Sequence, residues 1–139
     1  MFNVANAIRY AFILQQFGDG ESGRAGYLLD AALTVVRGLP RLGIAGHGIR
    51  DVHVLALQGK PLEALEAFRD AVDAGFRGGT MNNGWPLAFD TYLAPLRDRA
   101  EFRAIYAEIE TDIERMRENV LRADRDDDWD TLRALAEST

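Results

Sequence analysis

Residues 58–72 read Gln-Gly-Lys-Pro-Leu-Glu-Ala-Leu-Glu-Ala-Phe-Arg-Asp-Ala-Val, and this stretch decides the predicted fold. Gly59 marks a turn, and Pro61 suits the first position of a helix, where its missing N–H costs no hydrogen bond. A small, a large and a second small side chain then recur at helical spacing, at Ala64, Phe68 and Ala71. The pattern predicts a helix that approaches a neighbouring helix closely at its small residues.

Helical spacing of apolar residues extends in both directions from this stretch. Two stripes precede it, one comprising Val4, Ile8, Ala11, Leu14 and Phe17, the other Ala25, Leu28, Leu29, Ala32, Leu33 and Val36. We expect a third helix over about residues 44–58, a loop over 77–86, a short helix over 86–92 and a last helix over 129–137. No stretch shows sustained alternation of apolar and polar residues, so the predicted class is all-α.

The chain of 139 residues and 15.5 kDa has the size of one domain, residues 1–139. We divide it into a first helix pair (1–40), a second pair (41–76), a loop with a short helix (77–98) and C-terminal helices (99–139). A chain of this length buries enough surface to fold without a disulfide or a structural metal.

Charge and composition exclude several classes of function. The sequence has no cysteine, which rules out disulfides and thiolate zinc sites. Its net charge of −6 argues against nucleic-acid binding, and residues 97–139, with 8 basic and 13 acidic side chains, contribute −5 of it. Polar residues interrupt the apolar opening, so we expect no membrane segment. Lys60 is the only lysine among 16 basic residues, a bias typical of a high-GC bacterium. We therefore expect a cytoplasmic bacterial protein.

The turn and helix of residues 58–72 resemble the second half of a tetratricopeptide repeat (TPR), through Gly59 and the Ala64, Phe68 and Ala71 spacing. A looser copy precedes it, comprising Leu14, Gly18, Ala25, Leu29 and Ala32. The segment with Trp85, Asp90, Leu93, Pro95, Leu96, Arg97, Asp98 and Phe102 is similar to the one that closes many bacterial arrays of this family. The resemblance covers about residues 4–110 and implies antiparallel helix pairs stacked as a short right-handed solenoid, followed by a long C-terminal helix.

The same resemblance implies a concave groove lined by the first helix of each pair, where a peptide or a partner helix binds. Its groove-facing positions correspond to Ile8, Arg9, Phe12 and Gln16 in the first pair and to Ile49, Arg50 and His53 in the second. Two arginines on this wall favour a carboxylate or an acidic peptide. Alternatively, Arg9 and Arg50 are simply solvated.

Three patterns invite sharper interpretations that the sequence does not support. Residues 43–48 are rich in glycine but have no strand before them, as a phosphate-binding loop requires. The aspartates of residues 124–130 lack the glycine and glutamate of a calcium loop. His47 and His53 are six residues apart on a predicted helix and point to different faces, so we expect each to be partly exposed, with a carboxylate or backbone contact. We predict no metal site, no cofactor and no enzymatic activity.

The long C-terminal pattern comprises Phe102, Tyr106, Ile109, Ile113, Met116 and Val120, with spacings of 4, 3, 4, 3 and 4. This is the seam of a short coiled coil. Its second half, Ile113, Met116 and Val120, can pack on the last helix or on a second chain, and we slightly favour the last helix. A homodimer through this seam stays open.

These features predict a non-catalytic protein–protein interaction scaffold, whose partner is a protein or an acidic peptide, with neither nucleic acid nor membrane involved. The alternative is a homo-oligomerisation or structural domain at the C-terminal end of a larger bacterial regulator.

Overall fold

The computed structural model describes residues 2–18, 22–78, 87–126 and 129–138, and all regular elements within these ranges are helical. They are the α-helices α1 (Val4–Gln16), α2 (Ser22–Arg37), α3 (Arg50–Leu57), α4 (Pro61–Asp73), α5 (Ala100–Asp126) and α6 (Trp129–Glu137), and the 3-10 helices η2 (Leu87–Phe89) and η3 (Thr91–Leu96). The predicted all-α class is confirmed for this part of the chain. Whether the helices form a TPR-like solenoid stays a prediction.

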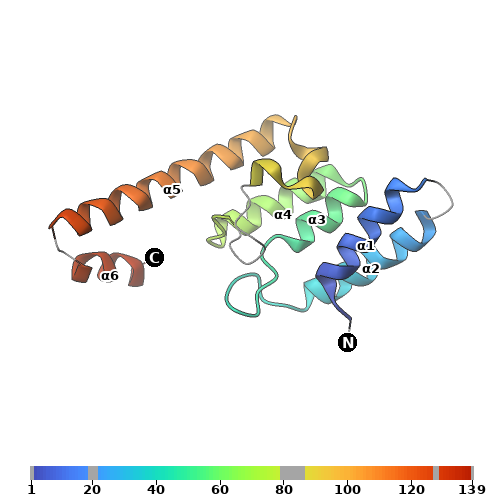
Figure 1. Cartoon of the computed structure of the whole chain (residues 1–139), viewed down its shortest axis with the longest axis horizontal. Helices are drawn as coiled ribbons and strands as arrows, with labels where there is room; N and C mark the ends of the chain where they lie inside the picture. Colours follow the sequence, from blue (N-terminus) through green and yellow to red (C-terminus); the bar gives the residue numbers. More distant parts are fainter. Residues whose placement is uncertain (1, 19–21, 79–86, 127–128, 139) are drawn as a thin grey trace.

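Helices α1 and α2 form one antiparallel pair, and α3 and α4 form a second pair beside it (Figure 1). Fully buried alanines on all but α3 keep the helices close, namely Ala11, Ala32, Ala64 and Ala71. Between α3 and α4 the chain turns at Gly59, whose φ of +71° is a conformation that other residues rarely adopt. The predicted helix of residues 58–72 is therefore confirmed as α4, in which Phe68, Ala64 and Ala71 are completely buried.

One predicted helix boundary is wrong, and one predicted apolar stripe is shorter than expected. The third helix begins at Arg50 rather than near residue 44, because Gly43 and Gly48 have φ values of +93° and +61°, which no right-handed helix contains. The first apolar stripe ends at Leu14, since Phe17 lies beyond the last turn of α1 and is 76% exposed. Residues 79–86, most of the predicted loop, lie outside the described residues.

We call the two helix pairs α1–α4 the body. The first half of α5 packs on the body, whereas in the described ranges the rest of α5 and α6 do not. The ring of Phe102 in α5 stacks on Phe68 of α4, with ring centroids 5.4 Å apart. The second half of α5 projects away from the helix pairs, and α6 folds back along its end (Figure 1). We call α5 from Ile113 onward, together with α6, the arm.

Candidate interaction surface

An aromatic row joins the predicted groove residues Phe12 and His53. The ring of Tyr92 in η3 lies edge-on between them, with centroid distances of 5.4 Å to Phe12 and 5.2 Å to His53. Phe12 belongs to α1 and His53 to α3, so three elements that are far apart in sequence meet at this point. Phe12 and Tyr92 are half-buried, whereas His53 is buried. The structure thus brings together two of the seven predicted residues and adds one aromatic ring.

Asp90 fixes His53 in this row. The Asp90 Oδ2 atom lies 2.7 Å from His53 Nε2, and Oδ1 accepts a hydrogen bond of 3.0 Å from the N–H of Tyr92. Arg97 donates to the Asp90 carbonyl oxygen at 2.5 Å. Burial raises the pKa of Asp90, but the hydrogen bond and charge of His53, the Tyr92 N–H and the charge of Arg97 hold it below its ordinary value. Asp90 is therefore an ionised group that orients both His53 and Tyr92.

The two predicted arginines lie one helical turn before the aromatic row. Helices α1 and α3 run parallel, because one turn beyond the row the side chain of Gln15 donates to the carbonyl oxygen of Leu57 at 2.9 Å. Arg9 precedes Phe12 by three residues and Arg50 precedes His53 by three, so both sit on the same faces as the row. Within the described part of the chain, neither guanidinium forms an ion pair.

The remaining predicted positions divide between core and surface. Ile8 and Ile49 are only 2% and 6% exposed and belong to the hydrophobic core, so they support the surface from beneath. Gln16 is exposed one turn after Phe12. We call Arg9, Phe12, Gln16, Arg50, His53 and Tyr92 the α1–α3 wall.

Tyr92 and Asp90 were not predicted as part of this surface. Local sequence places Asp90 before a turn, where an aspartate commonly accepts a backbone N–H two residues later. Asp90 and His53 are 37 residues apart in the sequence, so no local pattern predicts their contact.

A second polar cluster fixes the segment between α2 and α3. Arg41 binds the Asp51 carboxylate through both terminal nitrogens, at 3.1 Å and 2.7 Å, and donates to the Gly48 carbonyl oxygen. His47 is buried beside them, with its Nδ1 atom 3.7 Å from Asp51 Oδ1, too far for a hydrogen bond. Burial lowers the pKa of His47; the charges of Arg41 and Arg50 lower it further, against the opposing effect of Asp51.

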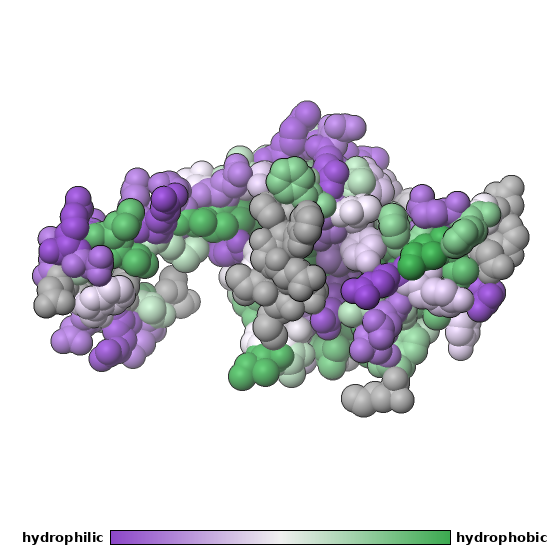
Figure 2. Space-filling model, viewed as in Figure 1, coloured by the Kyte–Doolittle hydropathy of each residue, from purple (hydrophilic) through white to green (hydrophobic). Residues whose placement is uncertain are grey.

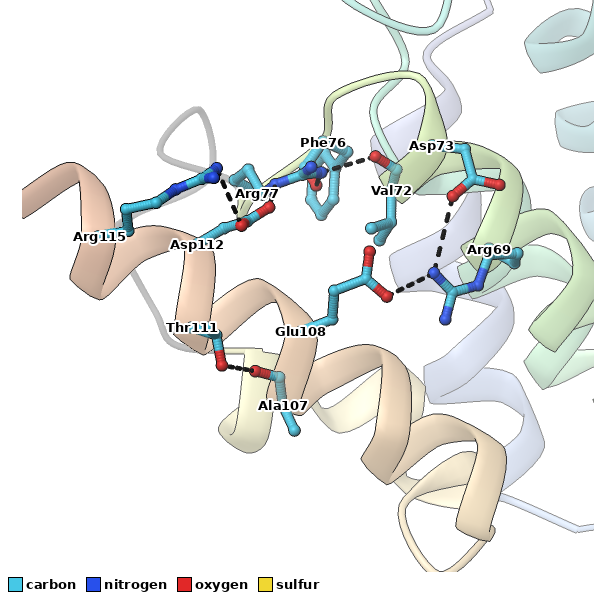
Figure 3. Close-up of polar contacts among 10 residues, drawn as sticks. All are labelled: Arg69, Val72, Asp73, Phe76, Arg77, Ala107, Glu108, Thr111, Asp112 and Arg115. Carbon is cyan, nitrogen blue, oxygen red and sulfur yellow. Dashed lines mark hydrogen bonds and ion pairs between the residues drawn. The ribbon is translucent and has the colours of Figure 1, made fainter.

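Two ion pairs attach α5 to the end of α4 (Figure 3). Arg69 lies 2.6 Å from Glu108, and the Nε atom of Arg77 lies 2.7 Å from Asp112. Arg77 also donates to the carbonyl oxygen of Val72 in the last turn of α4, which accepts from the N–H of Gly75 as well, and to that of Phe76 just after the helix. Arg77 therefore joins the end of α4 to the last turn of α5 that touches the body.

The second half of the predicted seam lies immediately beyond this attachment and is exposed. Ile113, Met116 and Val120 are 45%, 44% and 42% exposed. Apolar side chains are visible along this part of α5, between α6 and the body (Figure 2). Helix α6 packs at the far end of α5, where Ala123 is buried, and the packing of Ile113, Met116 and Val120 on this last helix stays a prediction.

No family model, curated protein or solved structure matches the chain. Its role has to be inferred from its own side chains. In the described ranges, no group of three or more acidic or histidine side chains could hold a metal ion, and no helix is both long and apolar enough to cross a bilayer.

Proposed function

We propose that this protein is a non-catalytic scaffold that binds an acidic peptide or partner segment on the α1–α3 wall. The observation that carries the proposal is the meeting of Phe12, Tyr92 and His53 from three elements in one aromatic row. Half-buried aromatic rings on a rigid scaffold offer contact area at little cost in side-chain entropy. A TPR-like array in the cytoplasm of a bacterium is the setting that we propose for it.

Charge selects the class of partner. Arg9 and Arg50 each precede the aromatic row by one helical turn on two parallel helices, and the described residues supply no carboxylate to either of them. A guanidinium binds a carboxylate through two parallel hydrogen bonds, so a segment with spaced Asp or Glu residues matches this pair. An aromatic or aliphatic side chain of the same segment would contact Phe12 and Tyr92.

Selection of random peptides displayed on phage tests this proposal directly. We expect the wild-type protein to enrich peptides with several Asp or Glu residues. The double variant Arg9→Glu/Arg50→Glu should bind them at least about tenfold more weakly, because each lost charge-assisted hydrogen bond is worth about 1.5–3 kcal/mol.

Arg37→Glu is the matched control, since Arg37 is an exposed arginine at the end of α2 and lies off the wall. It should bind the selected peptides like the wild type. Equal binding by the double variant, with unchanged helical circular dichroism, would remove both arginines from the site.

A second proposed function is homo-oligomerisation. It is favoured by the exposure of Ile113, Met116 and Val120, three apolar side chains at coiled-coil spacing on one face of the arm. Light scattering over a range of protein concentrations tests it: we expect a mass above that of one chain, whereas a constant mass of 15.5 kDa would contradict it.

A further inference from the structure

The protein has a second exposed apolar surface, in a segment whose charge is opposite in sign to that of the arm. The segment between α2 and α3 exposes Leu39, Leu42 and Ile44 to 37%, 41% and 97%. We call residues 39–48 the apolar loop. It lies outside the α1–α3 wall, and nothing in the described chain covers Ile44.

The apolar loop is held in one conformation. The N–H of His47 donates to the Pro40 carbonyl oxygen at 2.9 Å, and the N–H of Gly48 donates to that of Arg41 at 2.8 Å. Gly46 packs so tightly that a Cβ atom there would lie 2.6 Å from the carbonyl oxygen of Arg41. A partner therefore meets an ordered apolar tip, and binding does not have to order the loop first.

Charge around the two surfaces is complementary. Residues 31–50 contain three arginines and no acidic residue, in a chain with a net charge of −6. Because Arg41 is paired with Asp51 and Arg50 belongs to the α1–α3 wall, the unpaired positive charge of this segment, among the described residues, is that of Arg37. Arg37 is exposed at the base of the loop and forms no ion pair with the other described residues. Residues 113–139, in contrast, carry 8 acidic and 5 basic side chains. The apolar loop thus has a positive charge beside it, and the arm has an excess of negative charge. Both surfaces also expose apolar side chains.

We infer that the arm of one molecule docks on the apolar loop of a second copy of this chain. The inference rests on the proposed homo-oligomerisation and names the surface that the arm meets. Ile113, Met116 and Val120 would cover Ile44 and Leu42, while acidic groups of the arm would approach Arg37. Because the two surfaces differ, each molecule offers one arm and one apolar loop to its partners.

Light scattering of single and mixed variants tests this contact. Ile44→Asp places a charge on the apolar loop and leaves the arm unchanged. Met116→Asp places a charge on the arm and leaves the loop unchanged. Each variant alone should have the mass of one chain, 15.5 kDa. An equimolar mixture retains one complete contact and should form a complex of about twice this mass. Leu62→Asp is the matched control, since Leu62 is 71% exposed on α4 and lies outside both surfaces; it should associate like the wild type.

The possible results separate the two proposals. If Ile44→Asp still associates, or if the mixture forms no complex, the arm does not dock on the loop, although the protein can still associate through its arms. If the wild type has the mass of one chain at every concentration, both the homo-oligomer and the arm–loop contact are overturned. Association that weakens as salt is raised supports the charge complementarity, and association that salt does not weaken contradicts it.

Discussion

At the scale of single residues, His47 shows how burial and neighbouring charges set the state of one side chain. It is 7% exposed, and its Nδ1 atom has no hydrogen-bond partner in the described structure. Asp51, the nearest carboxylate, is already bound by Arg41 through both oxygens. A protonated imidazole would therefore be buried beside two arginines with its one counter-charge shared, so the neutral form is favoured.

This state of His47 predicts a pH dependence of stability. Its pKa in the folded protein lies below the ordinary value of 6.5, so the unfolded chain binds the proton more readily. The stabilisation is complete above pH 6.5 and is lost as the pH falls through the lowered pKa. We expect urea denaturation to give a smaller free energy of unfolding at pH 5 than at pH 7.5.

His47→Asn should reduce this pH difference, whatever its effect on stability at pH 7.5. The interval avoids Asp90, whose contribution is lost only below its ordinary value of 3.8. The same difference between pH 7.5 and pH 5 in wild type and variant would show that His47 does not titrate in this way.

At the scale of elements, the attachment of α5 to α4 depends on two arginines of unequal burial (Figure 3). The side chains of Arg77 and Asp112 are 29% and 20% exposed, whereas those of Arg69 and Glu108 are 39% and 45% exposed. Arg77 also donates to the carbonyl oxygens of Val72 and Phe76, at and just beyond the end of α4. An exposed pair contributes little, while a part-buried one leaves polar groups unsatisfied when it is broken.

We therefore expect Arg77→Met to lower the free energy of unfolding by about 1–3 kcal/mol. Arg69→Met, the matched substitution, should lower it by less than about 1 kcal/mol. Urea denaturation followed by circular dichroism at pH 7.5 measures both. An effect of Arg69→Met equal to or larger than that of Arg77→Met would contradict the unequal roles of the two pairs.

Helix starts illustrate what local sequence can and cannot predict. The helix after Gly59 was predicted because its turn, its proline and its Ala64–Phe68–Ala71 spacing are all local signals. The start of α3 was predicted six residues too early, because the apolar loop depends on Arg41 binding Asp51, ten residues away, and on glycine conformations that the pattern does not encode.

At the scale of the whole molecule, the order of the elements explains why the wall was only partly predicted. Phe12 and His53 were expected on one surface because they occupy equivalent positions in two successive pairs. The ring between them comes from η3, which packs on α3 only after α4 has brought the chain back across the second pair. The apolar spacing of Ile113, Met116 and Val120 is visible in the sequence. Their exposure is not, because it depends on how far α5 extends beyond the helix pairs.

The central claim is that partners bind on the α1–α3 wall, and the two histidines of the chain provide direct probes of it. His53 lies in the aromatic row, whereas His47 lies in the apolar loop. The decisive measurement is an NMR titration of the histidine ring signals with an acidic peptide selected on the wild-type protein. The His53 signals should shift to saturation, and by more than those of His47, which lies outside the wall. Unchanged His53 signals at saturating peptide would contradict the claim.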